Sequence, residues 1–356
     1  MQNFLGQDGF IWFVGVVEDR QDPNKLGRVR VRCLGYHTAD KNALPTSDLP
    51  WASPVLPITS SGISGIGQTP LGLVEGSWVF GFFRDSSYAQ EPMILGSLPG
   101  RPTEEASEGG FYDPNKIFPR HTDEPDTNRL AVNNEDNPHL GLELRKATRI
   151  TGLATADFDA DTAADASTIT ASDTDNWDQP EIAYASQYPS NHVYESESGH
   201  ILEFDDTSAA ERIHLQHKTG SSFEYNPNGD RVQIIKGIDY NLTSSHNLVN
   251  IEGRSDISIG GRHKIYINKN GAENNNYDIQ VGPNANVNIQ VDTGDINLVT
   301  KQGKVNVNSG GDYNVKVGGN YTMTVAGNRN ITTDGTTTDN TTGAVIHRGS
   351  TIDLNP

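Results

Sequence analysis

The sequence is poor in cysteine and in long apolar runs. Cys33 is the single cysteine among 356 residues, which excludes an intrachain disulfide framework and a metal site built from several cysteines. No run of 18 apolar residues occurs, and the N-terminus lacks a charged segment followed by an apolar one. We therefore expect neither a membrane-spanning helix nor a signal peptide.

Apolar and basic residues are also scarce. Hydrophobic residues make up 34% of the chain, which is low for a compact globule and indicates an architecture with a narrow core. The net charge is −19, and it is uneven. Residues 1–228 hold 16 Lys and Arg against 34 Asp and Glu, whereas residues 229–356 hold 11 against 12. Because an acidic surface repels phosphate, we expect no nucleic-acid partner.

Glycine, in contrast, is abundant and recurs at a fixed interval in the last third of the chain. The spacing is eight residues from Gly303 to Gly343 and again from Gly229 to Gly261, with Ser245 at the one missing position. Counting each glycine as the first residue of an octad, the fifth and seventh positions are mostly aliphatic. Alternation at period two predicts a short strand with one buried face, and the glycine predicts a corner.

One octad is too short to enclose a core of its own. A solitary β-helix has coils of about 18 residues or more, so an octad can cover only one face of a prism, and three chains would close it. The sequence therefore predicts an all-β chain whose residues 229–343, here called the shaft, form an intertwined triple-stranded β-helix in a homotrimer. Its expected core side chains are Val249, Ile251, Ile257, Ile259, Ile265, Ile267, Val315, Val317, Met323 and Val325.

Residues 1–100 predict a small OB-fold barrel, because about five short β-branched and aromatic runs are separated by turn residues. In one of these runs, Arg28, Arg30 and Arg32 alternate with valines. Such a row of arginines suits either an oligonucleotide or a protein partner, and the acidic context favours the protein.

Five ordered motifs in this barrel resemble a known family. They are VGVVEDR (14–20), DPNKLGRVRVR (22–32), LPWA (49–52), VEGSWV (74–79) and ILG (94–96). Together they resemble the N-terminal barrel of the baseplate spike proteins of contractile phages. That family includes the hub-lysozymes of T-even-like phages and, more distantly, the VgrG spikes of type VI secretion. The resemblance implies that Arg28, Arg30 and Arg32 dock on a ring-shaped tail hub protein.

The segments after the barrel divide into an acidic linker and a collar. Residues 101–187 predict an extended linker, and residues 188–228 resemble the collar that leads into the needle of such spikes. T-even-like hub-lysozymes carry a muramidase domain between barrel and needle, but the linker is too short and too acidic for one. We expect no enzyme, no catalytic residue and no cofactor. We interpret the collar histidines, His214 among them, and its adjacent aspartates as trimer-interface residues rather than as a metal site.

Residues 344–356 form the expected tip. In related spikes a PAAR-type protein caps this end, and Val345, Ile346, Ile352 and Leu354 could seat one. Three copies of His347 could instead hold a metal ion. That alternative is weaker, because Arg348 and Gly349 follow where self-sharpened spikes have a second histidine.

The resulting expectation is a structural protein of the virion tail baseplate, made in the host cytoplasm, which pierces the host envelope when the sheath contracts and touches its outer membrane transiently. Two alternatives remain open. One is a trimeric β-helical tail adhesin or a polysaccharide-degrading tailspike, although octads are short for a substrate groove. The other is an oligonucleotide-binding barrel on a stalk, which the charge disfavours.

Overall fold

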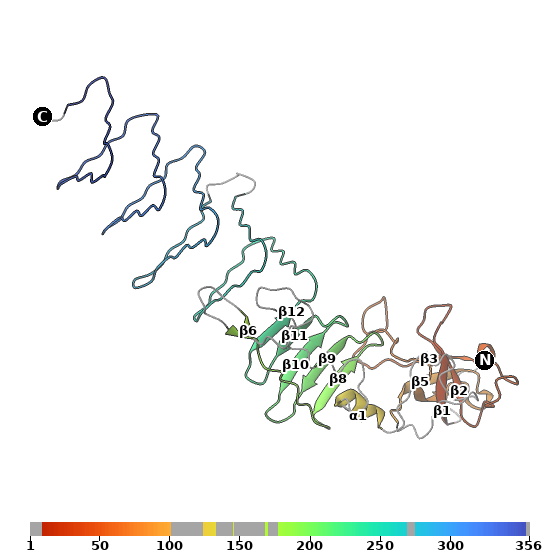
Figure 1. The fold of residues 1–356 in the computed structure, drawn as a ribbon. Coiled ribbons are helices and arrows are strands. Elements are labelled where there is room, and N and C mark those ends of the chain that lie inside the picture. Colours follow the sequence, from red (N-terminus) through yellow and green to blue (C-terminus); the bar gives the residue numbers. More distant parts are fainter. Residues whose placement is uncertain are drawn as a thin grey trace. The chain divides into compact units, whose positions relative to one another are not determined.

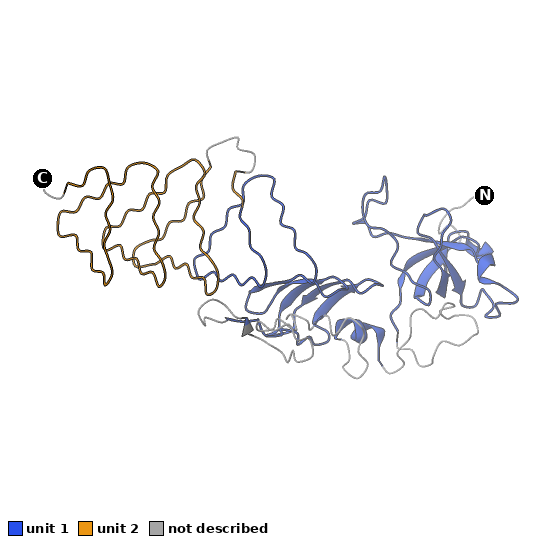
Figure 2. Cartoon of the chain, turned by 45° about the horizontal axis from the view of Figure 1, so that its top comes forward, with its two compact units in different colours: residues 1–265 blue, residues 266–356 orange. Residues whose placement is uncertain are grey.

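The computed structural model describes residues 9–100, 124–132, 145, 168–169, 177–268 and 275–353. The chain divides into two compact units, residues 1–265 and residues 266–356 (Figure 2). No helix in these described stretches is long and apolar enough to cross a membrane.

The first part of unit 1 is a closed five-stranded barrel, as the sequence predicts for an OB fold. Its strands are β1 (Ile11–Asp19), β2 (Val29–Cys33), β3 (Trp51–Pro54), β4 (Trp78–Phe83) and β5 (Pro92–Ser97), joined in the order β1-β2-β3-β5-β4 (Figure 1). Only β3 and β5 pair in parallel. The short 3-10 turns η1 (Thr46–Asp48) and η2 (Ser86–Tyr88) lie in its loops.

Two strand glycines allow the barrel to close. A Cβ on Gly81 would lie 2.0 Å from the carbonyl oxygen of Met93 and 2.8 Å from Cζ of Phe13. A Cβ on Gly15 would lie 2.5 Å from Cγ1 of Val31. Both positions therefore need glycine for close approach, because a side chain would push paired strands apart.

The second part of unit 1 is a five-stranded antiparallel sheet, here called the collar sheet. Its strands are β8 (Asn191–Glu195), β9 (Ile201–Asp205), β10 (Arg212–Gln216), β11 (Ser222–Tyr225) and β12 (Arg231–Ile234) (Figure 1). They follow in sequence order because short connections join them, three of which contain a glycine. Helix α1 (Asp126–Ala131) packs against β8. The short strands β6 (Thr168–Ile169) and β7 (Trp177–Asp178) pair with each other.

Beyond Ile234, the described residues form no strand paired within the chain. Instead, extended segments alternate with bends, and the bends keep the interval of eight: 236–237, 244–245, 252–253 and 260–261, then 310–311, 318–319, 326–327, 334–335 and 342–343. One further bend at Ser350 continues the interval beyond the last regular glycine. The chain thus winds as an open coil whose straight sides meet at corners (Figure 2), and the predicted corners are confirmed.

Most corners of the coil do not need the conformational freedom of glycine within one chain, contrary to the expectation from the sequence. Among the regular corner glycines only Gly229 has a positive φ, and a Cβ on Gly253, Gly311 or Gly319 would meet nothing within 4 Å of the same chain. One chain alone would therefore tolerate side chains at most corners, as Ser245 shows. Bends also fall at 283–284, 292–294 and 301–303, about nine residues apart. Gly261 and Gly303 are 42 residues apart, two more than five intervals of eight. Part of this shift in register therefore lies at these bends and not only in the Asn-rich residues 269–278, of which 269–274 are outside the described ranges.

Candidate assembly surfaces

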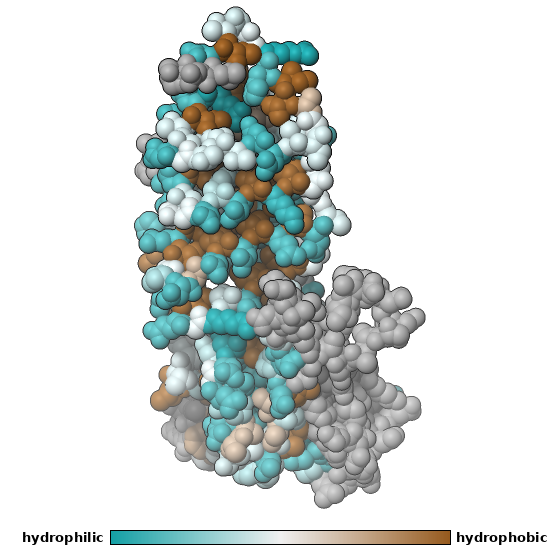
Figure 3. All heavy atoms as spheres, turned by 60° about the vertical axis from the view of Figure 1, so that its left-hand side comes forward, coloured by the Kyte–Doolittle hydropathy of each residue, from teal (hydrophilic) through white to brown (hydrophobic). Residues whose placement is uncertain are grey.

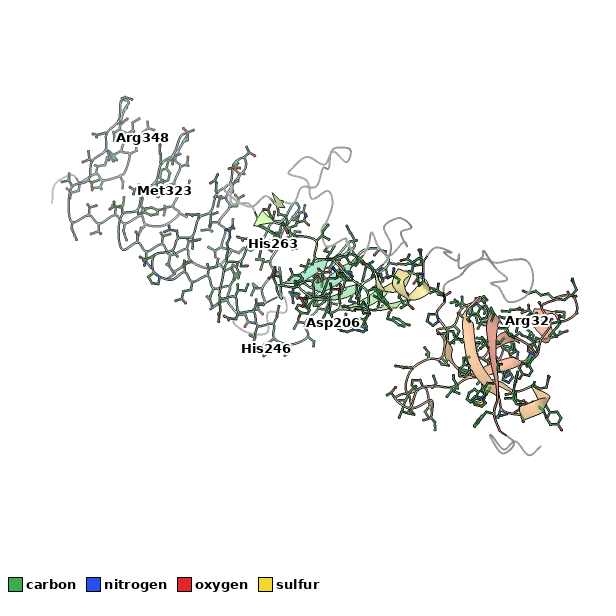
Figure 4. All side chains as sticks on the ribbon, turned by 90° about the horizontal axis from the view of Figure 1, so that it is seen from below. Arg32, Asp206, His246, His263, Met323 and Arg348 are labelled. Carbon is green, nitrogen blue, oxygen red and sulfur yellow. The ribbon has the colours of Figure 1, made fainter. Side chains whose placement is uncertain are left out.

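Arg28, which precedes β2, and Arg30 and Arg32 of β2 do not form an exposed docking face. Arg32, which Figure 4 labels on the barrel, has a side chain that is 0% exposed. Its guanidinium donates to both carboxylate oxygens of Glu18, at 2.6 and 3.1 Å, and to the carbonyl oxygens of Thr38 and Leu44, at 2.6 and 2.8 Å. The segment after β2 folds back over this side of the strand. The prediction that Arg32 docks on a hub protein is therefore wrong.

Arg28 and Arg30 are also engaged within the barrel. Arg28 forms a salt bridge of 2.7 Å with Asp22, and this guanidinium holds the pKa of Asp22 well below its ordinary value. Arg30 donates to the carbonyl oxygens of Thr46, Ser47 and Leu49, and its guanidinium lies over the Trp51 ring at 4.5 Å. Both side chains fix loops to the barrel wall, so little of either is free for a partner.

Glu18 is the buried counterion of Arg32, and the two side chains form a buried ionic group. Burial alone would raise the pKa of its carboxyl, but hydrogen bonds from Arg32 and from the Thr46 hydroxyl, with the charge of Lys41, outweigh burial and lower the pKa. The Thr46 hydroxyl donates to Glu18 at 2.6 Å. The group therefore ties the loop between β2 and β3 to β1 and β2.

The exposed face of the barrel is aromatic instead. Trp12 stacks on Phe80 with centroids 5.2 Å apart and planes at 7°. Phe10 and Phe82 join them through contacts of 5.3 to 5.6 Å. Phe10, Trp12 and Phe80 are exposed although large and apolar. We call these four side chains the aromatic patch. Neighbouring apolar side chains on an exposed strand face are typical of protein-contact sites.

The collar sheet buries its polar face. On that face, Glu203, Arg212, His214 and Glu224 are all buried by the protein's own chain. Arg212 lies 2.7 Å from Glu203 and 3.1 Å from Glu224, and Arg145 also lies within 3.8 Å of Glu203. Buried charges are tolerated only when they are paired in this way.

Hydrogen bonds extend the network to neighbouring segments. The Asn191 amide donates to Glu203 at 2.6 Å and to the carbonyl of Ala131 at the end of α1 at 2.7 Å. Burial raises the pKa of the nearby Glu195 carboxyl, although the charges of Arg145 and Arg129 oppose that rise. The network thus anchors α1 to the sheet.

His214 and Asp205 are placed differently from the prediction, whereas His192, His217 and Asp206 stay exposed. His214 lies inside the protomer, with Nδ1 2.8 Å from a Glu224 oxygen and Nε2 3.0 Å from Oε1 of Gln216, so it is not an interface residue. His217 follows β10 and packs on His200 with centroids 4.6 Å apart. Asp205 is buried, whereas Asp206 is exposed and lies 3.7 Å from His192. Within the described part of one chain, no group of three His, Cys, Asp or Glu side chains could hold a metal ion.

The opposite face of the collar sheet is apolar and open to solvent. Cross-strand partners on it are Phe204 with Ile213 and Leu202 with Leu215, and β11 extends the row. The exposed side chains of this apolar collar face are Tyr194, Leu202, Phe204, Ile213, Leu215 and Tyr225. The sheet is therefore reversed relative to an ordinary monomeric domain, since its apolar side is the uncovered one.

The expected core side chains of the shaft are uncovered as well. Apolar side chains recur along the coil between polar ones (Figure 3), and all ten of the predicted core residues are exposed. The seventh octad position is less exposed than the fifth in every pair, for example Ile257 at 79% and Ile259 at 48%. Tyr266, between two core positions, is 77% exposed against 56% for Ile265. The seventh octad position, and to a lesser degree the fifth, thus turns toward the inside of the coil.

At the C-terminal end, Val345, Ile346 and Ile352 are exposed, and Leu354 lies outside the described residues. His347 occupies an odd octad position, the fifth after the corner at Gly343.

Comparisons with known proteins match two parts of the chain. A family model described as the Gp5 N-terminal OB domain matches residues 35–187. A second, described as the Gp5 C-terminal repeat, matches three copies in residues 311–334, which is one copy per octad.

Two curated relatives carry the same name. Protein Gp5 of Vibrio phage KVP40 is 38% identical over 297 residues, spanning 75% of this chain and 67% of that protein. The pre-baseplate central spike protein Gp5 of Enterobacteria phage T4 is 45% identical over 130 residues, spanning 35% of this chain but 22% of that protein. With its OB barrel, its octad repeats and its extensive match to the KVP40 protein, the chain belongs to the Gp5 family of phage tail baseplate proteins.

Proposed function

We propose that three copies of this chain form the central spike of a contractile phage tail baseplate, which pierces the host envelope when the sheath contracts. The observation that carries this proposal is the uncovered apolar surface. The apolar collar face and the core positions of the shaft are exposed in one chain, and no described residue of a single copy covers them.

Association of identical chains would remove this apolar surface from water. Burying one large aliphatic or aromatic side chain contributes about 1.5–3 kcal/mol, and the collar face alone offers six of them in each chain. The gain would recur along every corner-to-corner segment of the shaft. A spike that must not buckle under load gains from such a core, because each chain is held by two others.

The backbone of the shaft leads to the same arrangement. Its described segments are extended but form no ladder within the chain, and unpaired strand edges are a template for pairing with further strands. Three interleaved chains would supply those partners and leave no open edge along the shaft. The family's octad repeat supports this wound trimer.

We place the docking surface for the ring-shaped hub protein on the aromatic patch. Arg28, Arg30 and Arg32 bind intrachain partners. Phe10, Trp12 and Phe80, in contrast, are exposed. Aromatic residues are enriched in protein interfaces and dominate their binding energy. Trp12→Ala should therefore weaken hub binding and leave the trimer intact, and Arg28→Ala should have the smaller effect.

We place a PAAR-type cap on Val345, Ile346, Ile352 and Leu354 at the other end of the chain. The final segments of the coil would otherwise present unpaired edges. We also propose that the chain has no peptidoglycan hydrolase activity of its own. A hydrolysing or adhesive tailspike is the less favoured alternative, since the matching T4 protein is a central spike protein by name.

Paired substitutions on one segment test the trimer. Val315 is an inward fifth-position residue, and Asn314 beside it is an outward fourth-position residue. Val315→Asp should prevent trimer formation, because three carboxylates would meet in an apolar core. Asn314→Asp, which adds the same charge outside, should form trimers as wild type does. Sedimentation equilibrium measures both.

The collar offers an independent test of the same proposal. Leu215→Asp on the apolar collar face should also impair association, whereas Lys218→Asp, in the turn after β10, should not. Equal effects of the inward and outward substitutions, or wild-type assembly of Val315→Asp, would contradict the proposed interface.

A further inference from the structure

The loop between β3 and β4 differs from the other loops of the barrel in its charge. Residues 55–74 contain no Asp, Glu, Lys, Arg or His, although charged residues make up 21% of the chain. The other three loops between barrel strands, residues 20–28, 34–50 and 84–91, each contain both acidic and basic residues. We call residues 57–72 the apolar loop. A partner that contacts it would meet no charge.

The apolar loop exposes large aliphatic side chains. Ile58, Ile63, Ile66 and Leu71 are each at least 67% exposed. Four such side chains on one uncharged loop leave apolar surface in water. Grouped apolar side chains of this kind are typical of protein-contact sites.

A tight turn fixes the tip of the loop. Ile63 and Ile66 form an isolated antiparallel bridge, and the Ile66 N–H donates to the Ile63 carbonyl at 2.9 Å. Ser64 and Gly65 between them have positive φ angles of 53° and 72°, as in a type I′ hairpin turn. The tip therefore holds its two isoleucines in a defined backbone conformation, which lowers the entropy cost of binding.

The base of the loop is fixed as well. The hydroxyl of the buried Ser60 accepts from the backbone N–H of Gln68 at 2.8 Å, which joins the two sides of the loop. A Cβ on Gly27 would lie 2.6 Å from Cγ of Pro70, so the end of the loop packs closely on the loop between β1 and β2. The apolar loop is thus an ordered part of the barrel that presents aliphatic side chains outward.

Threefold symmetry accounts for the absence of charge. A side chain close to a threefold axis faces two copies of itself, so a charged residue there would meet its own charge and be repelled. A loop that binds a different protein has no such restriction, because complementary charges can meet across that interface. The uncharged loop therefore favours a second copy of this chain over the hub protein as its partner.

Resting on the trimer of the proposed function, we infer that the apolar loops of the three barrels contact one another at the threefold axis, through Ile63 and Ile66 at their tips. Stable interfaces bury about 1,200–2,000 Å² of surface, and three loop tips offer less. The contact would therefore align the barrels of a trimer that the collar and the shaft hold together. The aromatic patch lies on other residues and stays available for the hub.

Single cysteines test this contact in the untagged full-length protein. Ser64→Cys places a thiol at the tip, and the control Ser47→Cys places one on η1, where Ser47 is also exposed. Trimers isolated by sedimentation are treated with a short bis-maleimide, boiled in SDS and separated by electrophoresis. Wild type, whose Cys33 is buried, gives the background. We expect at least tenfold more cross-linked dimer from Ser64→Cys than from Ser47→Cys, at a fraction that does not change on dilution.

A charge at the tip gives a second readout. Ile66→Asp, made together with Ser64→Cys, would bring three carboxylates to the axis and should lower the cross-linked fraction at least tenfold. Ser47→Asp in the same Ser64→Cys protein adds an equal charge elsewhere on the barrel and should leave the fraction unchanged. Ile66 and Ser47 are both exposed in one chain, so neither change should unfold the barrel.

A trimer in which Ser64→Cys cross-links no more than Ser47→Cys would overturn the loop contact and leave the proposed function standing. The same result, together with weaker binding of the phage's hub protein to Ile66→Asp, would overturn it in favour of the hub as the partner of the loop. A monomer would instead overturn the proposed function itself.

Discussion

At the scale of single residues, the Glu18–Arg32 pair fixes the loop between β2 and β3 to the barrel wall. Glu18→Gln would leave the buried Arg32 charge without its counterion. Removing one partner of a buried pair costs about 3–5 kcal/mol. We expect a clear fall in the barrel's unfolding temperature at pH 7, measured by tryptophan fluorescence, because Trp12, Trp51 and Trp78 lie in the barrel.

The same pair gives the barrel a pH dependence of known sign. The pKa of Glu18 in the folded state lies below its ordinary value of 4.5. Its contribution to stability is therefore complete above about pH 4.5 and is lost as pH falls through the folded pKa. The difference in unfolding free energy between wild type and Glu18→Gln should shrink below pH 4.5. A difference that stays constant down to pH 2 would show that the ion pair is not its source.

Cys33 reports on the same region. Its side chain is buried in the barrel core, and burial raises the pKa of its thiol to about 12. Because the thiolate is the reactive form, we expect no labelling by a disulfide reagent at pH 8 until denaturant unfolds the barrel, and then one thiol per chain. Rapid labelling of the native protein would contradict the placement of Cys33.

The row of arginines shows what the sequence can and cannot predict at this scale. Alternation along β2 correctly placed Arg28, Arg30 and Arg32 on the side away from the valine core. It could not show that the loop through Thr38 and Leu44 returns to cover Arg32, since that depends on contacts distant in sequence. The sequence does contain one signal for the burial of Arg32, namely the acidic Glu18. Val17 pairs with Val31, and Glu18 and Arg32 are the next residues along these two strands.

At the scale of elements, Gly81 is the strand residue with the least room. Overpacking a core costs about 1–3 kcal/mol and sometimes more, and the obstacle to a Cβ here is the backbone oxygen of Met93. Gly81→Ala should lower the barrel's unfolding temperature by roughly 10 °C or more. The control is Gly96→Ala on β5, where a Cβ meets nothing within 4 Å. Equal unfolding temperatures of Gly81→Ala and Gly96→Ala would contradict the barrel packing.

The collar sheet shows where sequence patterns fail at this scale. Leu202-Glu203-Phe204-Asp205 and Ile213-His214-Leu215-Gln216 alternate clearly, so strands with one apolar and one polar face are predictable. Which face the chain itself covers is not, because alternation does not say which other segments pack on the sheet. Here α1 and Arg145 cover the polar face, and the apolar face remains for other copies.

At the scale of the whole molecule, octad repeats and barrel motifs were enough to predict the family, because both signals are local in sequence. The absence of hydrolase activity in this chain remains a prediction. Zymograms of the purified protein on peptidoglycan should stay dark from about pH 4 to 8, with a known muramidase as the positive lane. A cleared zone that vanishes when one carboxylate in residues 101–187 is changed would contradict it.

The trimer is the central claim of this account, and mass in solution tests it most directly. Sedimentation equilibrium of the untagged protein at micromolar concentration should give three times the chain mass of 38.7 kDa, and the same species should persist in SDS at room temperature. A mass of 38.7 kDa across that concentration range, with the apolar collar face and the coil exposed as they are in one chain, would contradict the account.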